Sequence, residues 1–398
     1  MTQSLFDAVI CGGGAVGATL AIALGQLGYE VALIEQKAPQ ALTQACAAFE
    51  ARTLALSHAS IYLYQALGIW ADLIDQAVPI RTVRVSVQGQ YGSSCLKNPR
   101  SDRSDHPLGY VVAADHLARA LYARLATLKN VDILQPATLI DSQVSPDGWR
   151  LDVLPTDQAL KTIHAQLLVS AEGAQGELSK KQQIATQETA YGHFALTTNI
   201  QLQPGLQQGA VERFFKQGAI ALLPWQGDYA TCVISCSKQQ AQALAQLDPQ
   251  GFMQACENFL GSRQGRVVGV GRRQLFPLKM VLANQQTSAR FLLMGNAAHA
   301  LHPIAAQGLN LSLRDIGHIR QRLFTLGLKQ DLGDPAFLAD YQAQRRGDQM
   351  RTCVGTDLIA RFMSGGPLPP ALRSAGLVLF DLMPGVKSIF TKMSMGIS

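Results

Sequence analysis

Charged residues are scarce in this chain: Asp, Glu, Lys and Arg make up 16% of its 398 residues, against about 25% in an average globular protein. Apolar residues reach 47%, which excludes a disordered or collagen-like chain. The net charge is +6, from 34 basic and 28 acidic residues, and like charges gather only in pairs such as Lys180-Lys181 and Arg345-Arg346. No nucleic-acid partner is therefore predicted.

Cysteines are few and odd in number, seven in all, which is not typical of a disulfide framework. Cys232 and Cys236 lie close together in the sequence, but no nearby His and Cys residues complete a zinc set, so no metal site is predicted. Buried reduced thiols are the favoured interpretation, and they indicate a reducing compartment.

No hydrophobic run has the features of a signal peptide or a membrane span. The longest charge-free stretch near the start, from Ala8 to Tyr29, follows Asp7 instead of a basic segment and is interrupted by glycines. Near the end, residues 376–391 are rich in Leu, Val and Phe. A packed core helix is the favoured interpretation there, and a helix that faces a membrane surface is the alternative.

The first 35 residues carry a dinucleotide-binding fingerprint. A strand-like run at 6–11 leads into a G-x-G-x-x-G turn formed by Gly12, Gly14 and Gly17, and a small, apolar helix and a second strand follow. Gly12 permits the tight turn, Gly14 lets the backbone approach a pyrophosphate, and Gly17 allows close helix–strand contact. Glu35 ends the second strand, where a carboxylate binds ribose hydroxyls. Because this acid is Glu, FAD or NAD is favoured over NADP.

Beyond Glu35, strand-like and helical patterns alternate. Helices are predicted over 58–75, from an N-cap at Asp115 to Leu128, and over 239–261. Strands are predicted within 80–96, at 131–134, 150–153 and 163–170, several times within 190–236, and at 291–294. The chain is too long for a single core, and the strand at 291–294 returns to the nucleotide-binding part after a β-rich segment. Interleaved domains are therefore predicted.

The stretch from Gly295 to Arg314 is the most informative in the sequence. It follows an apolar strand and places a polar turn, with His299 and His302, before a predicted helix, an arrangement that faces an anion or a cofactor. Together with the N-terminal fingerprint, with Arg52 in A-R-T-L-A-L-S, and with Arg213-Phe214 and Ala221–Pro224, it resembles the FAD- and NAD(P)H-dependent aromatic-ring hydroxylases, the fold class of para-hydroxybenzoate hydroxylase. Within that class the whole chain is most similar to the ubiquinone-biosynthesis hydroxylases of the 2-octaprenyl-6-methoxyphenol hydroxylase type.

This resemblance implies a fold and its boundaries. The fold is a mixed α/β (α+β) class, with a Rossmann-like FAD-binding domain interleaved with a β-sheet substrate domain and followed by a helical C-terminus. The FAD-binding domain takes residues 1–77, 101–185 and 281–330, the substrate domain takes 78–100 and 186–280, and the C-terminal helical region takes 331–398.

The resemblance also implies roles for single residues. Gly12, Gly14 and Gly17 hold the FAD pyrophosphate, Glu35 binds the adenosine ribose, and Arg52 lies along the cofactor. Gly295 and Asn296 meet the ribitol or the pyrophosphate, and a flavin-positioning loop is formed by Pro303, Gly308, Leu309 and Asn310. Pro224 is a candidate for the wall of the substrate pocket. His299 is interpreted as a structural histidine beside the cofactor, and His302 is left undecided.

One motif departs from the family pattern. Relatives carry Asp-Gly followed by Ser and Arg in an element that touches the flavin and is linked to nicotinamide use. Here Glu172 replaces the Asp, Gly176 the Ser and Ser179 the Arg. The longer acid and the missing cation weaken the expectation of efficient reduction by NAD(P)H. FAD binding, with Glu172 among the contacts, stays the expectation.

The function implied is that of an FAD-dependent monooxygenase. NADPH or NADH reduces FAD, O2 adds to give a flavin hydroperoxide, and a phenolic ring, expected to be a prenylated methoxyphenol, receives the oxygen. Three alternatives remain: a hydroxylase of a small soluble aromatic, a flavin dehydrogenase of the same fold, and a non-catalytic FAD-binding member of a biosynthetic complex. A nicotinamide-only dehydrogenase is disfavoured because Gly295–Asn310 has no role in it. A cytoplasmic protein is expected, with contact to the inner face of a membrane left open, and the sequence does not indicate an oligomeric state.

Overall fold

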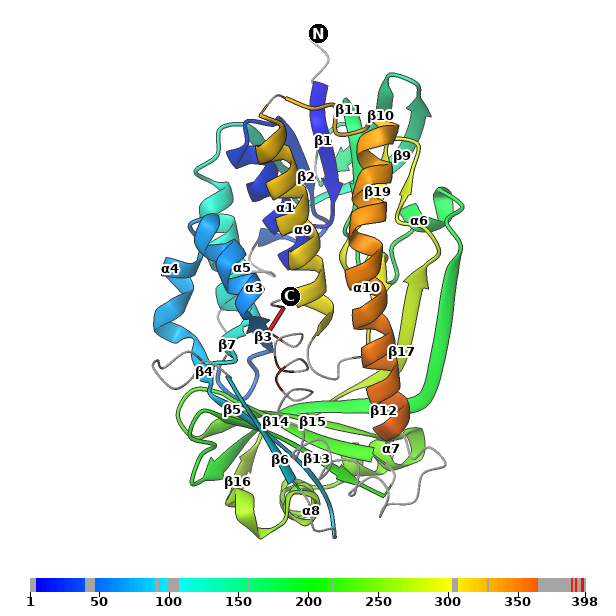
Figure 1. The fold of residues 1–398 in the computed structure, drawn as a ribbon. Helices are drawn as coiled ribbons and strands as arrows, with labels where there is room; N and C mark the ends of the chain where they lie inside the picture. The colour runs from blue at the N-terminus through cyan, green and yellow to red at the C-terminus, as the bar shows by residue number, and fades with distance from the viewer. Residues whose placement is uncertain are drawn as a thin grey trace.

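The computed structural model describes residues 5–39, 47–89, 93–98, 107–156, 158–216, 218–302, 307–327, 329–363, and 388, 391, 395 and 396. Three sheets organise this part of the chain (Figure 1). Two large sheets, A and C, lie at opposite ends of the molecule, and the small sheet B lies between them.

Sheet A has the strand order β18–β19–β11–β1–β2–β8, and β10 and β9 continue from β11. The strands are β1 (Leu5–Cys11), β2 (Val31–Ile34), β8 (Val131–Leu134), β9 (Ala137–Ser145), β10 (Gly148–Pro155), β11 (Lys161–Ser170), β18 (Thr287–Ser288) and β19 (Phe291–Leu293). β1 pairs in parallel with β2 and with β11, and β19 extends this parallel core. Both faces of such a core are covered, which explains why β1 is buried from Phe6 to Cys11.

Helices cover one face of sheet A and form its main core. They are α1 (Ala15–Gln26), α3 (His58–Ala66), α4 (Trp70–Leu73) with the short 3-10 turn η1 (Ile74–Gln76), α5 (Ala114–Leu125) and α9 (Gln307–Leu326). α1 lies directly against both α5 and α9. On the other face, Trp149 and Phe291 belong to a second apolar cluster, beside α6 (Leu178–Lys181).

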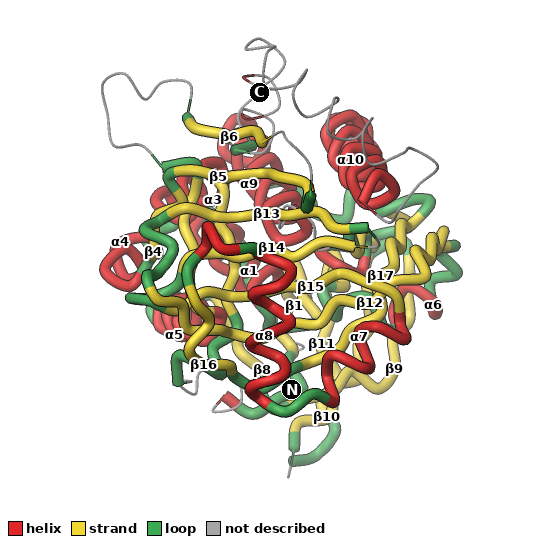
Figure 2. The backbone as a smooth tube through the Cα atoms, turned by 90° about the horizontal axis from the view of Figure 1, so that it is seen from below, coloured by secondary structure: helices red, strands yellow, loops and turns green. Residues whose placement is uncertain are grey.

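Sheet C has the order β20–β17–β12–β15–β14–β13–β5–β6, with β16 beside β12. The strands are β5 (Thr82–Val87), β6 (Ser93–Lys97), β12 (Thr186–Gln203), β13 (Gly209–Phe215), β14 (Gly218–Pro224), β15 (Tyr229–Ser237), β16 (Arg266–Val270), β17 (Gln274–Ala283) and β20 (His299–Ala300). Figure 2, seen from below, shows α7 (Lys238–Gln246) and α8 (Pro249–Leu260) across its outer face. The 3-10 turn η2 (Ser262–Gln264) follows α8.

Sheet B and α10 connect the two ends. Sheet B consists of β3 (Thr53–Ser57), β7 (Gly109–Ala113) and β4 (Val78–Ile80), all antiparallel. α10 (Pro335–Met363) runs past both large sheets (Figure 1). Its Leu338 packs in the core of sheet A, and its Ala360 packs against sheet C.

Most of the predicted elements are present, with three corrections. The helix expected over 58–75 ends at Ala66 and resumes at Trp70, because Gly68 adopts a left-handed conformation (φ +74°). Asp115 is not an N-cap: α5 starts at Ala114, directly out of β7, so Asp115 lies in the first turn.

The helix expected over 239–261 is likewise two helices, because Asp248 caps a new start at Pro249. Residues 376–391 fall almost wholly outside the described residues. Among the helices that the structure describes, none has the length and hydropathy needed to cross a bilayer.

Candidate active site

The glycine turn between β1 and α1 has the geometry of a phosphate cradle. Gly12 is in the left-handed region (φ +107°), which an L side chain rarely adopts. A Cβ on Gly17 would lie 2.0 Å from the carbonyl oxygen of Gly12, so only glycine lets α1 approach the turn this closely. A Cβ on Gly14 would meet no atom within 4 Å, so open space lies in front of the helix N-terminus. No described side chain caps α1, which leaves its first N–H groups for an anion.

Glu35 lies at the end of β2, beside the turn. Its Oε2 accepts a hydrogen bond of 2.7 Å from the N–H of Gly13, and its Oε1 accepts one of 2.8 Å from the N–H of Lys37. The carboxylate is thus held in place by two backbone donors and keeps lone pairs for ribose hydroxyls.

Tyr122, which the sequence did not indicate, also shapes this turn. Its hydroxyl donates to the carbonyl oxygen of Gly13 at 3.1 Å. Burial, and then the charge of Glu35, raise the pKa of Tyr122, so it stays a neutral donor. A Cβ on Gly13 would lie 2.3 Å from the Tyr122 hydroxyl, so Gly13 is restricted as well.

The altered motif at 172–179 lies directly against the glycine turn. A Cβ on Gly12 would lie 2.5 Å from the carbonyl oxygen of Ala171. The Oε2 of Glu172 accepts hydrogen bonds from the Ser170 hydroxyl at 3.1 Å and from the N–H of Leu178 at 3.3 Å. Glu172 therefore reaches back to brace its own loop at the start of α6.

The turn that begins at Gly295 lies against the glycine turn at the start of α1. Gly295 begins the 3-10 turn η3 (Gly295–Ala297) in a left-handed conformation (φ +67°), and its Cβ position lies 3.3 Å from Val16 of α1. Asn296 is exposed, and its Oδ1 lies 3.8 Å from the Cβ position of Gly308 in the first turn of α9. The structure therefore brings together the starts of α1 and α9, which the sequence separates by almost 300 residues. Pro303 lies outside the described residues.

Asn310 ties the first turn of α9 to sheet B. Its Oδ1 accepts from the N–H of Ser57 at 2.8 Å and from the Ser60 hydroxyl at 2.6 Å, and its Nδ2 donates to the carbonyl oxygen of Ala55 at 2.9 Å. The Asn310 side chain thus anchors the first turn of α9 to β3 and α3.

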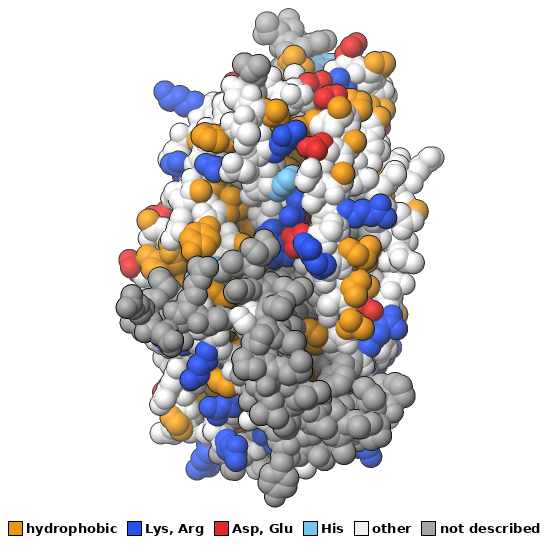
Figure 3. Space-filling view, in the orientation of Figure 1, with side chains coloured by type: hydrophobic (Ala, Val, Ile, Leu, Met, Phe, Trp, Pro, Cys, Tyr) orange, Lys and Arg blue, Asp and Glu red, His pale blue; other side chains and the backbone are white. Residues whose placement is uncertain are grey.

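A buried ion network holds the turn after β19 against α9 and α10. His299 Nε2 lies 3.0 Å from Asp315 Oδ2, and Arg345 Nε donates to Asp315 Oδ1 at 2.6 Å. Asp348 joins Arg345 to Arg314, which donates to it at 2.9 Å. Figure 3 shows charged side chains of both signs gathered between α9 and α10.

Burial works against the charge on Asp315, but His299 and Arg345 outweigh it and lower the pKa of this carboxyl. His299 therefore has the structural position that the sequence suggested, although its Nδ1 has no partner among the described residues. His302 is buried against the edge of the Tyr191 ring, with centroids 5.1 Å apart. Burial, and then His193, lower the pKa of His302 to about 4, which keeps it neutral. In the described ranges, no three His, Cys, Asp or Glu residues gather as metal ligands would.

Arg52 is exposed and directly precedes β3. The backbone before it is held by hydrogen bonds from Asn199, a residue of β12 in sheet C. Asn199 Nδ2 donates to the carbonyl oxygens of Ala48 and Ala51, at 2.8 and 2.7 Å. Asn199 was not predicted as a site residue, because its partners are remote in the sequence. These bonds fix the backbone that leads into Arg52 without occupying its guanidinium.

Pro224 ends β14 and is buried. Strand alternation puts it on the same face as Ile220 and Leu222, which pack in the core under α7 and α8. Its neighbours Leu223 and Trp225 instead face sheet B. The pocket-wall role of Pro224 stays a prediction, and these two neighbours are better placed for it.

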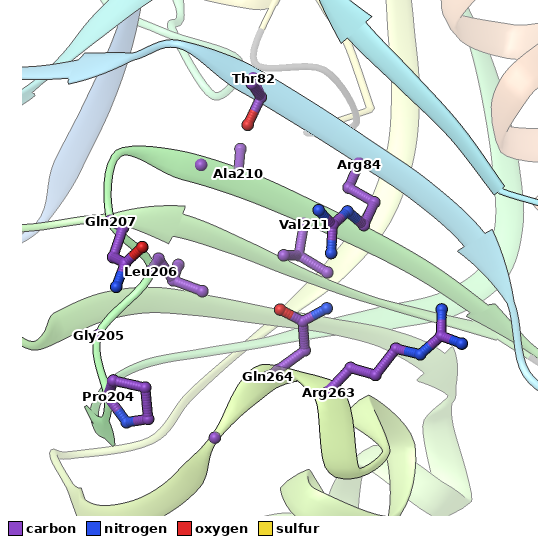
Figure 4. Close-up of a pocket in the computed structure, with 12 residues that line it drawn as sticks. Thr82, Arg84, Pro204, Gly205, Leu206, Gln207, Ala210, Val211, Arg263 and Gln264 are labelled. Carbon is purple, nitrogen blue, oxygen red and sulfur yellow. The ribbon is translucent and has the colours of Figure 1, made fainter.

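A cavity of about 330 Å3 lies elsewhere, on the outer side of sheet C (Figure 4). Thr82 and Arg84 of β5 line it, together with Arg263 and Gln264 of η2. Val211, also in its lining, belongs to the core shared with α8, so the cavity opens on the face away from sheet B. None of the proposed flavin contacts lines it.

The comparison that decides the family covers almost the whole described chain: residues 6–353 match the family described as FAD binding domain. The chain belongs to the FAD-dependent monooxygenases. FAD is the cofactor of this monooxygenase, and NAD(P)H is the reductant. The cradle formed by Gly12, Gly14 and Gly17, open in front of an uncapped helix, fits the pyrophosphate of that cofactor.

Two relatives and one solved structure show how far the likeness extends. The monooxygenase is 32% identical to ubiquinone hydroxylase UbiL of Rhodospirillum rubrum, over 98% of this chain and 89% of that protein. It is 26% identical to 3-demethoxyubiquinol 3-hydroxylase of Escherichia coli, over the full length of both. Its fold matches p-nitrophenol 4-monooxygenase PnpA of Pseudomonas putida with a TM-score of 0.79 at 16% identity, over 98% of this chain and 97% of that one.

Proposed function

We propose that this monooxygenase hydroxylates the ring of a prenylated methoxyphenol in ubiquinone biosynthesis, with NAD(P)H as the electron donor and O2 as the oxygen donor. The observation that carries the proposal is its similarity, along nearly the whole chain, to relatives named as hydroxylases of ubiquinone and its precursors. The meeting of α1, η3 and α9 at one place supports it, because a single extended cofactor can contact all three.

FAD supplies the redox chemistry when it is bound, and the chain binds and orients it. In the proposal, Gly12, Gly14 and Gly17 and the start of α1 bind the pyrophosphate, and Glu35 binds the ribose. Arg52, Gly295 and Asn296 lie along the ribitol and pyrophosphate, and Glu172 braces the adjoining loop. Gly308, Leu309 and Asn310 direct backbone groups and the α9 dipole at the flavin ring, where they stabilise negative charge. Pro303 is assigned to the same loop from the sequence alone.

The substrate side of the proposal rests on sheet C. The apolar face of Leu223 and Trp225 lies against sheet B, and an aromatic ring with a prenyl chain needs such a surface. The proposed partners are the aromatic substrate and O2. The proposed location is the cytoplasm, where the protein contacts the inner face of a membrane or belongs to a biosynthetic complex. A prenylated phenol partitions into a bilayer, which is the reason for proposing that contact.

A second candidate is a protein that holds FAD without catalysing hydroxylation. The observation that favours it is the loop 172–179, where Glu172 bonds to its own loop and the usual Arg is Ser179. A hydroxylase of a small soluble aromatic is a variant of the first proposal and differs only in substrate.

The test is an anaerobic absorbance spectrum of the FAD-loaded protein after addition of NADPH or NADH. We expect the flavin band to bleach, and to bleach faster when a prenylated methoxyphenol is present. Bound flavin that stays oxidised with either nucleotide, with the phenol present, would favour the non-catalytic candidate. E172D, which restores the family acid, is expected to bleach at least as fast as the wild type, and E177D in the same loop is the matched control.

A further inference from the structure

The face of sheet C that is turned away from α7 and α8 carries two apolar clusters with a gap between them. Toward sheet B, Ala210 packs with Val111. Toward α10, Phe214 packs with Ala360. Because side chains alternate along β13, Glu212 lies on this same face, between Ala210 and Phe214. An acidic residue thus occupies the gap between two apolar clusters.

The gap is hollow. In register, Glu212 pairs with Ala221 of β14, and Ala221 pairs with Val233 of β15. All three are only half-buried, although they lie in the interior strands of a sheet that faces the rest of the molecule. On the opposite face of these strands, Ile220 and Ile234 are fully buried under the helices. The half-buried row is therefore the floor of a hollow.

Strand β3 links this hollow to the turn that is proposed to face the flavin. On β15, two residues before Val233, Thr231 forms a hydroxyl–hydroxyl hydrogen bond of 2.7 Å with Thr53 at the start of β3. At the other end of β3, Ser57 donates to Asn310 in the first turn of α9. β3 thus connects the floor of the hollow, through Thr53, to the turn that is proposed to face the flavin ring, through Ser57.

The carboxyl of Glu212 has no hydrogen bond or ion pair with any residue that the structure describes. On the elements around it, the titratable groups are Tyr229 in the cluster toward sheet B and Tyr191 in the cluster toward α10. His302 lies against the Tyr191 ring, and His193 of β12 is on the same face of sheet C as Val233. The charged residues Asp357 and Arg361 of α10 pair with each other at 2.8 Å. Burial alone raises the pKa of Glu212 to about 7. A polar group buried without a partner costs free energy, and a ligand that supplies the partner recovers it.

We propose that Glu212 is a catalytic residue, which binds the ring hydroxyl of the phenolic substrate and takes its proton. This inference rests on the proposed hydroxylase function. The step is a proton transfer: the O–H bond of the phenol breaks, an O–H bond forms on the carboxylate, and no electrons are exchanged at Glu212. When the hydroxylated carbon then gives up its hydrogen as a proton to water and the ring regains aromaticity, the protonated Glu212 returns its proton to the ring oxygen. A deprotonated ring is richer in electrons and accepts oxygen more readily.

The experiment compares two ligands on the oxidised, FAD-loaded protein without NAD(P)H. One ligand is a methoxyphenol with a short prenyl chain, and the other is its O-methyl ether, which has no hydroxyl to donate. Dissociation constants are measured for the wild type, for E212Q, and for E188Q. Glu188 is the matched control, since it lies on sheet C but is exposed and paired with Lys279 at 3.1 Å.

The wild type and E188Q are expected to bind the phenol at least about tenfold more tightly than the ether near neutral pH, because the hydrogen bond goes to a charged acceptor. E212Q is expected to bind both ligands about equally while it retains FAD. The phenol preference of the wild type should also disappear as pH falls well below the pKa of Glu212, and E212Q should show no such pH dependence.

The outcomes separate this inference from the proposed function. A wild type that prefers the phenol, together with E212Q that keeps the full preference, would overturn the role of Glu212 and leave the hydroxylase proposal standing. A wild type that binds neither ligand would overturn both. E212L, which fills the hollow with an apolar side chain, provides a second folded variant and is expected to lose the phenol preference as E212Q does.

Discussion

The buried pair of Asp315 and Arg345 should be the most sensitive single contact in the scaffold of the site. Asp315 accepts from Arg345 at 2.6 Å and from His299 at 3.0 Å, and its side chain is 1% exposed. D315N keeps the size of the side chain but removes the negative charge, which leaves the Arg345 guanidinium buried without its main counter-ion. Removing one partner of a buried pair costs about 3 to 5 kcal/mol.

Because the Asn oxygen can still accept a hydrogen bond from one of the Asp315 partners, we expect D315N to lower the free energy of unfolding by about 3 kcal/mol. The assay is urea unfolding of the FAD-free protein, followed by tryptophan fluorescence. D340N is the matched control, since Arg322 and Asp340 also join α9 to α10, at 3.1 Å, but are 45% and 33% exposed. That pair should contribute less than about 1 kcal/mol.

The pH dependence follows from the lowered pKa of Asp315. A carboxyl whose pKa is lower in the folded chain stabilises the fold above its unfolded pKa, and this contribution is lost as pH falls through the folded value. Acid should therefore destabilise the wild type more than D315N. Equal losses for D315N and D340N, or equal acid sensitivity of wild type and D315N, would refute the reasoning.

Three further predictions concern the site. G17A should weaken FAD binding at least about tenfold and destabilise the fold by about 2 kcal/mol, because its Cβ would lie 2.0 Å from the carbonyl oxygen of Gly12. The control is G347A on α10, where a Cβ meets no atom within 4 Å, and this variant should be neutral or stabilising. FAD binding of both variants is followed by flavin fluorescence, and their stability by thermal unfolding. E35Q keeps an acceptor for Gly13 N–H but loses the charge, so FAD should bind about tenfold more weakly by fluorescence titration, and unchanged affinity would argue against ribose binding there. Since the pKa of Glu212 rises from 4.5 to about 7 on folding, this group destabilises the wild type as pH increases through that range. E212Q should therefore be more stable than the wild type by about 3 kcal/mol near pH 8 and equal to it near pH 4. A constant difference between these pH values in thermal unfolding would contradict the assigned burial.

The parts of the fold that are determined by residues close together in the sequence could be predicted from it. The turn from Gly12 to Gly17 was predicted because each glycine has a local geometric reason, and the open space at Gly14 agrees with the assigned role. The free, mostly buried thiols also agree with the composition. Asp115 was misassigned because an acid fits both an N-cap and a first turn, and its pairing with Arg119 at 3.0 Å decides for the latter. The domain boundaries and the cofactor contacts stay predictions.

The contacts that complete the site could not be predicted, because they join residues remote in the sequence. Tyr122 bonds to Gly13 across 109 positions, and Asn199 reaches Ala51 across 148. Neither residue stands in a motif, since each looks like an ordinary member of a helix or strand. Glu212 was not predicted as a site residue, although it precedes Arg213-Phe214, because only the pairing of β13 with β5 and β14 places it above a hollow.

The most direct test of the account is the fate of isotopically labelled O2 during turnover. The FAD-loaded monooxygenase is supplied with NAD(P)H, a prenylated methoxyphenol and heavy-oxygen-labelled O2, and the product is analysed by mass spectrometry. The account predicts one labelled oxygen atom on the aromatic ring, with the second atom in water. Oxidation of NAD(P)H that yields only labelled hydrogen peroxide, with an unchanged ring, would contradict it.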